Sequence, residues 1–152
     1  MMRRPFCAST ERRYIWTAAQ SYDQDILNDW SSDNPDRLAQ FQQQIRLNAD
    51  NSKMVIAAAG ESIVGFGEVS LKTQEVKAVY VLPSAGRQGI GKQLLKHLEK
   101  FARESGLKDL WLDSSLNAET FYAANGFVLD AHGEHTLRSG RTMQCIKMRK
   151  TL

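Results

Sequence analysis

The apolar positions along the chain follow two different periods. Near the start, Tyr22, Ile26 and Trp30 recur every four residues, which predicts a short helix. A second helix is expected to begin with Asn34 as its N-cap and Pro35 in its first turn, where the missing N–H of proline needs no partner. The buried positions of that second helix would be Leu38, Phe41 and Ile45. Residues 1–19 fit neither period.

From residue 54 onward, short apolar runs between turn residues predict strands. These runs are 54–59, 63–71, 75–82, 107–112, 127–131 and 142–148. The first two runs are separated only by residues 60–62, and the last two by a segment with a turn near Ser139 and Gly140. Each of these two pairs is therefore expected to form a hairpin.

Helical spacing returns twice within this series of strands. Residues 90–102 predict one long helix, for which Gly106 is a natural stop, and residues 117–125 predict a short one. The long helix would connect the third and fourth strands. The order predicts an α/β (α+β) fold with a mixed, mostly antiparallel sheet and a strand–helix–strand crossover in its middle.

Length and composition narrow the class of protein. The 152 residues suit a single domain over 1–152, and no linker or repeat indicates a boundary. No apolar run approaches the roughly 18 residues that span a bilayer. The net charge of +3 is weak for a nucleic-acid-binding protein, and Cys7 and Cys145 lie in no metal-ligand spacing. We therefore expect a cytoplasmic protein with no metal, no nucleic-acid partner and no membrane contact.

A glycine-rich turn joins the third strand to the long helix. Gly86, Gly89 and Gly91 would let the backbone approach a ligand closely, and the helix N-terminus adds partial positive charge. Arg87 and Lys92 add mobile cations, so the turn favours a pyrophosphate. On these residues alone, a turn that only caps the helix is an equally valid interpretation.

Two other phosphate-binding motifs fit this turn less well. A P-loop needs a Ser or Thr after its lysine, but residue 93 is Gln, although the run that ends at Asp113 resembles the strand that follows such loops. A dinucleotide fingerprint has the order G-x-G-x-x-G, whereas these glycines run G-x-x-G-x-G. Both departures disfavour a nucleotide-hydrolysing or dehydrogenase domain.

The turn resembles motif A of the GNAT acetyltransferases, which spans about residues 75–105 here. Gly89, Ile90 and Gly91 match the motif, as does Pro83 before the turn. Gly86 departs from it, because the family usually has Gln or Arg there. The resemblance implies the GNAT fold and acetyl-CoA as co-substrate.

A later segment, about residues 107–127, is similar to motif B of the same family. The matching residues are Ala118, Tyr122, Gly126 and Phe127. Ser115 stands in place of the usual Asn. Together with Tyr22 and Trp30, Ser115 is similar to a poorly characterised bacterial branch of small-molecule acetyltransferases.

The resemblance also implies the roles of individual residues in the cofactor site. It places the pyrophosphate on the turn and the pantetheine arm and oxyanion donor on the preceding strand, with Ser115 beside the arm. The implied cofactor-binding residues are Val79, Tyr80, Val81, Arg87, Gln88, Gly89, Ile90, Gly91, Lys92 and Ser115.

Three residues are candidates for proton transfer. The family places a tyrosine at Tyr122 to protonate the departing thiolate, although a tyrosine packed in the core with its hydroxyl on backbone is the alternative. Glu75 resembles the general base of histone-type members, and Glu68 on the preceding strand is a second candidate. Both glutamates could also be solvated residues near a strand end, with a chain of water molecules as the base.

The remaining polar and aromatic residues carry weaker signals. His132 and His135 are interpreted as a loop pair without metal, and His97 as surface. Cys145 is expected to be buried filler. Tyr22 and Trp30 could line an acceptor pocket or pack in the core.

The function expected from the resemblance is an N-acetyltransferase that moves acetyl from acetyl-CoA to a primary amine of a small molecule by direct attack. One alternative is acetylation of a protein N-terminus or lysine. Another is an acyl-CoA-binding module without catalysis. A homodimer is one arrangement that the family allows.

Overall fold

The computed structural model of the protein describes residues 20–30, 43, 47–137 and 139–152. The second helix expected from the sequence, with Leu38, Phe41 and Ile45 on its buried side, lies outside the described residues. So do residues 1–19 and the side chain of Trp30.

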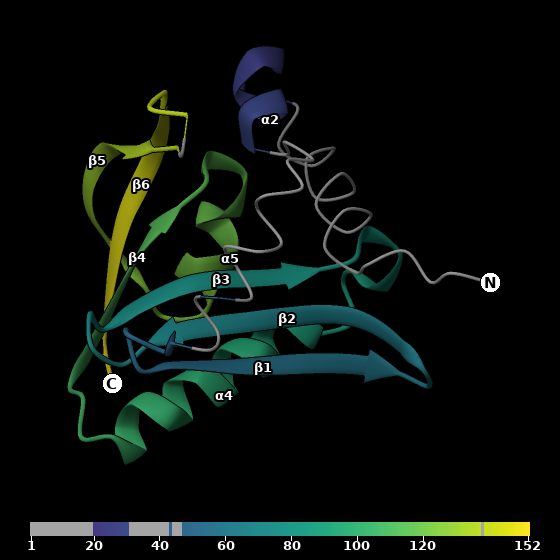
Figure 1. The fold of residues 1–152 in the computed structure, drawn as a ribbon, viewed down its shortest axis with the longest axis vertical. Coiled ribbons are helices and arrows are strands. Elements are labelled where there is room, and N and C mark those ends of the chain that lie inside the picture. The colour runs from purple at the N-terminus through teal and green to yellow at the C-terminus, as the bar shows by residue number, and fades with distance from the viewer. Residues whose placement is uncertain (1–19, 31–42, 44–46, 138) are drawn as a thin grey trace.

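One mixed sheet of six strands forms the body of the protein, in the order β1-β2-β3-β4-β6-β5 (Figure 1). The strands are β1 Ser52–Ala59, β2 Ser62–Ser70, β3 Glu75–Val81, β4 Asp109–Ser114, β5 Val128–Thr136 and β6 Thr142–Thr151. Four of the five neighbouring pairs are antiparallel, and β3 and β4 are parallel. The expected α/β fold with its central crossover is therefore confirmed.

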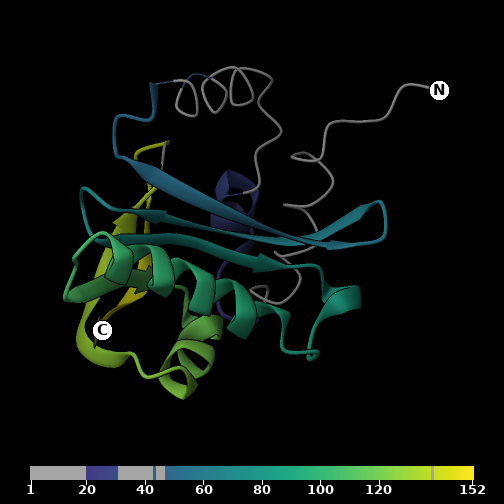
Figure 2. The same cartoon turned by 90° about the horizontal axis from the view of Figure 1, so that it is seen from below.

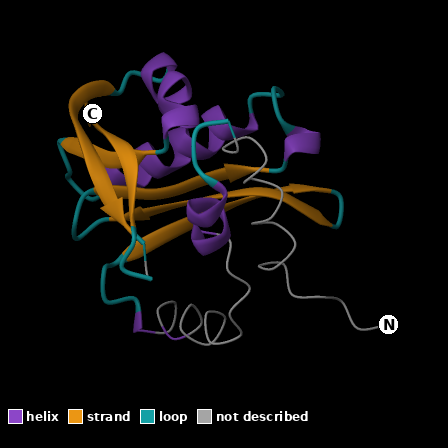
Figure 3. Cartoon of the chain, turned by 90° about the horizontal axis from the view of Figure 1, so that it is seen from above, coloured by secondary structure: helices purple, strands orange, loops and turns teal. Residues whose placement is uncertain are grey.

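The helices cover the two faces of this sheet unequally. The long crossover helix α4, Ile90–Glu104, and the short helix α5, Glu119–Ala124, lie on one face (Figure 2). Helix α2, Gln24–Trp30, lies on the other face (Figure 3). Two short 3-10 turns, η1 Pro83–Ala85 and η2 Leu116–Ala118, precede α4 and α5. None of the helices in the described part of the chain has the length and apolar character needed to cross a membrane.

The main hydrophobic core lies between the sheet and α4. Its fully buried members include Leu95 and Leu98 of α4, Val69 of β2 and Leu112 of β4. A second, smaller cluster joins α2 to the far end of the sheet. Its members are Tyr22, Leu27, Leu137 and Met143. The two clusters lie on opposite faces, because successive side chains of a strand alternate between faces.

The element boundaries differ from the sequence-based ones mainly in the last hairpin. The expected strand over 127–131 is longer and runs as Val128–Thr136, so His132 and His135 lie in a strand. The interpretation of these histidines as a loop pair was therefore wrong. The segment is polar because β5 is the edge of the sheet and is largely exposed, so it lacks the apolar alternation that marks a strand in a sequence. The short helix expected over 117–125 is divided into η2 and α5.

Candidate active site

The two parallel strands at the centre of the sheet separate soon after they meet. β3 pairs with β4 only at Glu75 and Trp111, supported by a bond from the Trp111 N–H to the Gln74 carbonyl. At the same place β3 carries an irregularity, because the partners of β2 jump from Ala78 to Val76 and leave Lys77 as an extra residue. Bulges of this kind bend a strand and increase its twist. Beyond the bulge, no strand in the described part of the chain pairs with this edge of β3, which borders an opening.

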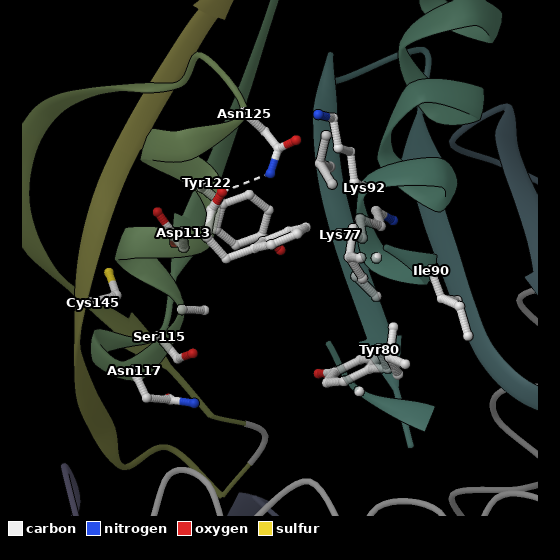
Figure 4. Close-up of a pocket in the computed structure, with 18 of the residues that line it drawn as sticks. Lys77, Tyr80, Ile90, Lys92, Asp113, Ser115, Asn117, Tyr122, Asn125 and Cys145 are labelled. Carbon is white, nitrogen blue, oxygen red and sulfur yellow. Dashed lines mark hydrogen bonds between the residues drawn. The ribbon is translucent and has the colours of Figure 1, made fainter. Parts of the chain in front are cut away.

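This opening is a cleft of about 600 Å³ between β3 and α4 on one side and β4, η2, α5 and β6 on the other. The volume is within the range of sites for small organic ligands. Figure 4 shows Tyr80, Ile90 and Lys92 on one side of the cleft and Ser115, Tyr122 and Asn125 on the other. The residues expected from both sequence motifs thus meet across one cavity.

The N-terminus of α4 opens onto one end of the cleft. Its N-cap is Gly89, which has a positive φ of 79° and provides no side-chain cap. Arg87 also adopts a left-handed backbone, with φ of 61°. The first N–H groups of a helix have no partner within the helix, and successive residues of this kind direct N–H groups toward a common anion. The turn can therefore cradle phosphate with its backbone, as its glycine pattern predicts.

Gly91 is required for a different reason. A Cβ atom at this position would lie 3.2 Å from the Phe121 ring of α5 and 3.6 Å from Val81. The glycine therefore lets α4 and α5 approach each other at the narrow part of the cleft. Packing between the two helices is thus a reason for a glycine at position 91 that the sequence pattern did not reveal, while the approach of a ligand there stays a prediction.

Tyr122 of α5 is buried and lines the cleft. Its ring packs edge-on against Phe121 and Phe127, with centroids 5.0 and 5.8 Å away. Among the described residues, no group forms a hydrogen bond with its hydroxyl. Buried hydroxyls almost always have a partner, so this one is available to a ligand. Burial also raises the pKa of Tyr122, which keeps the phenol protonated.

Glu75 lies where β3 and β4 begin to separate, and it lines the cleft. Burial raises the pKa of its carboxyl, Lys77 opposes that rise and Asp113 adds to it. A glutamate with a raised pKa is suited to accept a proton near neutral pH. Glu68 does not line the cleft. It pairs with Ala78 from β2, so β3 separates it from the opening.

A polar cluster that sequence reasoning missed lies on the sheet face opposite α4. Asp113 of β4 accepts a hydrogen bond of 3.0 Å from Lys147 and lies 3.3 Å from Nδ1 of His135. The carboxylate raises the pKa of Lys147 through that bond. Cys145 is buried beside it, and burial followed by the nearby Asp113 charge raises the pKa of its thiol. The thiol therefore stays protonated and is a poor nucleophile.

The signal that could have found this cluster was weak. In β4 the residues Leu110, Leu112 and Ser114 face the main core, so Asp113 must face the other side. Its partners come from β5 and β6, which no spacing in the sequence connects to β4. The described residues contain no group of three or more His, Cys, Asp or Glu side chains placed to hold a metal ion.

Most of the predicted cofactor residues come together in the cleft. Those that line it are Val79, Tyr80, Val81, Arg87, Gly89, Ile90, Gly91, Lys92 and Ser115. Gln88 does not line it, because its side chain points to solvent between the two left-handed residues of the turn. Tyr22 does not line this cleft either, and it packs in the smaller core cluster, which is the second of its two interpretations.

Comparison with known proteins identifies the family. Residues 18–152 match the family described as the acetyltransferase (GNAT) domain. The chain belongs to the GNAT acetyltransferase family. The GNAT motifs at the turn and at α5 are thus the ones that border the cleft.

Two solved GNAT structures have a similar fold. A GCN5-related N-acetyltransferase from Rhodopseudomonas palustris is 24% identical, with a TM-score of 0.78 over 98% of this chain and 94% of that one. The PaiA N-acetyltransferase from Thermoplasma acidophilum, solved in complex with coenzyme A, is 21% identical, with a TM-score of 0.72 over 96% of this chain and 90% of that one. At these identities the likeness shows the fold alone.

Two curated relatives match over a shorter region. The streptothricin acetyltransferase of Streptomyces lavendulae is 32% identical over 81 residues, which are 50% of this chain and 43% of that protein. The IAA acetyltransferase of Azospirillum brasilense is 32% identical over 82 residues, which are 49% of this chain and 54% of that protein. The chain therefore spans about half the length of the curated relatives it matches.

Proposed function

We propose that the protein is an acetyl-CoA-dependent N-acetyltransferase that transfers acetyl to a primary amine of a small molecule by direct attack. The observation that carries the proposal is the buried hydroxyl of Tyr122. It faces the cleft without a hydrogen-bond partner among the described residues, opposite the backbone of β3. We also propose that one acetyltransferase domain spans residues 1–152.

Acetyl-CoA fits the end of the cleft at α4. The turn provides N–H groups and the Arg87 and Lys92 side chains for the pyrophosphate. The edge of β3 that no described strand covers runs from there toward Glu75, so an extended pantetheine arm could bond to its backbone as a further strand would. The solved complex of the PaiA N-acetyltransferase with coenzyme A supports this choice of co-substrate.

The transfer requires two proton movements: one proton leaves the amine, and one reaches the departing thiolate. The amine nitrogen forms a bond to the thioester carbon, and the bond from that carbon to sulfur breaks. In this proposal Glu75 takes a proton from the amine, directly or through water, and Tyr122 gives one to the departing thiolate. The raised pKa of each group matches its task, because Glu75 gains basicity and Tyr122 remains protonated.

The acceptor would enter from the sheet face opposite α4. Glu75 and Asp113 line the cleft there, and two carboxylates attract a cationic amine. The curated relatives named for streptothricin and IAA support a small-molecule acceptor. We assign no role to Glu68 or Gln88, because neither lines the cleft.

The proposal is tested by incubating the purified protein with acetyl-CoA and a panel of small amines. Release of free coenzyme A thiol and a mass gain of one acetyl group on one amine are expected. A matched incubation of cell lysate with labelled acetyl-CoA tests the protein-acceptor alternative. Binding of acetyl-CoA without thiol release from any amine or protein would leave only a binding module and refute the enzyme assignment.

A further inference from the structure

Tyr22, two residues before the start of α2, is buried although it does not border the cleft. Its ring packs with Leu27, Leu137 and Met143, and 9% of the residue is exposed. Further contacts fix α2 against the β5–β6 hairpin. Arg141 lies 3.5 Å from Asp29 and 3.8 Å from Asp25, and the Ser139 hydroxyl bonds to Asp29. These contacts hold the ring of Tyr22 and helix α2 in place in addition to the hydrogen bonds of the Tyr22 hydroxyl.

Among the described residues, the hydroxyl of Tyr22 makes two hydrogen bonds to backbone groups. It accepts one of 2.8 Å from the Leu116 N–H in η2, and it donates one of 2.8 Å to the Gln144 carbonyl in β6. These two partners are 94 and 122 residues away in the chain. One oxygen atom thus connects three segments that are remote in the sequence.

The two partners are the ones that would pair next if β4 and β6 continued. The antiparallel register of β4 and β6 ends at Ser114 and Ile146. A further step of two residues along both strands would bring Leu116 opposite Gln144. There the N–H would bond directly to the carbonyl, but the Tyr22 hydroxyl stands between them. The hydrogen-bond ladder between β4 and β6 is therefore interrupted at this pair, because one hydroxyl group bridges the N–H and the carbonyl.

The residues on either side of these partners form part of the cleft wall. Ser115 and Asn117 flank Leu116, and Met143 and Cys145 flank Gln144, and all four line the cleft. The Tyr22 hydroxyl is thus inserted at the point where residues 115–117 and residues 143–145 face each other. Tyr22 therefore contacts the backbone behind the cleft wall, but it does not itself line the cleft.

We propose that Tyr22 is a positioning residue whose hydroxyl holds η2 away from β6 and so fixes the cleft wall at Ser115 and Asn117. The inference rests on the proposed function only for its consequence, which is that coenzyme A binding needs that wall. Without the hydroxyl, the Leu116 N–H and the Gln144 carbonyl must bond to each other or to water. Either change moves Ser115 relative to the edge of β3.

The test compares Tyr22→Phe with Val69→Ala. The first removes only the hydroxyl, and the second makes a cavity in the main core, where Val69 is fully buried and does not line the cleft. Both variants are expected to melt earlier than the wild type. At a temperature where all three proteins are folded, we measure coenzyme A affinity by calorimetry and the amide resonances of residues 115–117 and 143–145 by NMR.

Only Tyr22→Phe is expected to shift those amide resonances and to weaken coenzyme A binding, by about tenfold. Unshifted resonances, or an affinity equal to that of Val69→Ala, would overturn the positioning role and leave Tyr22 as a packing residue. If the wild type itself binds no coenzyme A, the proposed function fails. The positioning role is then decided by the amide resonances alone.

Discussion

The wall of the cleft formed by β3, the turn and α4 presents mainly backbone, whereas the opposite wall presents mainly side chains. On the first wall, the left-handed Arg87 and Gly89 and the free edge of β3 direct peptide groups into the cavity. On the second, Asp113, Tyr122 and Cys145 project from three different elements. A cofactor shared by a family needs only main-chain groups and space, while proton transfer needs particular side chains. In the function proposed above, the first wall binds the cofactor and the second carries out the chemistry, with Glu75 at their junction.

The sharpest way to break this comparison is Tyr122→Phe. If the hydroxyl protonates the departing thiolate, the turnover number should fall by about 10²–10⁴-fold while acetyl-CoA affinity stays near the wild-type value. The melting temperature should change little, because no described residue depends on that hydroxyl for a hydrogen bond.

Steady-state kinetics and a thermal melt, measured on the same preparation, check this expectation. Phe121→Leu serves as a control for packing, since it alters the neighbouring ring without removing a proton donor. Normal turnover in Tyr122→Phe would show that the thiolate leaves without help from this wall.

Glu75→Gln tests the junction of the two walls. We expect turnover at neutral pH to fall by about 10²-fold, the low end for general base catalysis, because water can reach this half-buried carboxyl and replace it in part. The acidic limb of the pH–rate profile should disappear in the variant. A limb that persists unchanged would assign the base to another group.

The same variant has a consequence for stability. Folding raises the pKa of Glu75 above its ordinary value of 4.5. At pH values between the unfolded and the folded pKa of this group, the folded state therefore binds more protons than the unfolded state. The wild type therefore loses stability as pH rises through that window. Glu75→Gln should lose less, which urea denaturation at several pH values would measure; equal slopes for both proteins would contradict the raised pKa.

The backbone wall is tested by Gly89→Ala against Gly106→Ala. The two glycines bound the two ends of α4, have φ of 79° and 81°, and have no atom within 4 Å of an added Cβ. Each substitution should destabilise the fold by about 1–2 kcal/mol through left-handed strain. Only Gly89→Ala should also weaken acetyl-CoA binding, by about tenfold, because its Cβ would occupy the space of a phosphate.

Calorimetric titration of both variants with acetyl-CoA separates strain from ligand approach. Equal affinities would mean that the N-terminus of α4 is not the phosphate site. This pair is preferable to Gly91, where a side chain would also displace Phe121.

The smallest expected effect is that of Arg87→Ala. An exposed cation on a phosphate contributes modestly, so we expect a loss of about 2–5-fold in acetyl-CoA affinity, decreasing as salt is added. Lys96 is an exposed lysine of α4 that does not line the cleft, and Lys96→Ala provides the control for net charge. A salt-independent loss in Arg87→Ala would indicate that the side chain acts through the conformation of the turn.

The sequence by itself determined the elements with strong periodicity and most of the residues that form the backbone wall of the cleft. The period of α4, its stop at Gly106 and the three glycines of the turn are local signals, because each depends on the backbone conformation of a few neighbouring residues. The two motifs therefore predicted the family and most of the residues on the backbone wall. They also predicted that Tyr122 belongs to the site, because its spacing from Gly126 and Phe127 is a local signal, and Tyr122 lines the cleft.

Only the tertiary structure decided that a polar cluster forms around Asp113 at the side-chain wall. Asp113, His135 and Lys147 come from three strands, and no periodicity in the sequence relates them. It also placed Glu75 at the cleft and Glu68 outside it, because the separation of β3 from β4 begins beside Glu75 and leaves Glu68 one strand away. The Tyr22 hydroxyl is the clearest case. Its bonds to Leu116 and Gln144 form because the pairing of β4 with β6 ends beside the segment that carries Tyr22. Such an arrangement depends on contacts between segments that are remote in the sequence, so no local pattern predicts it.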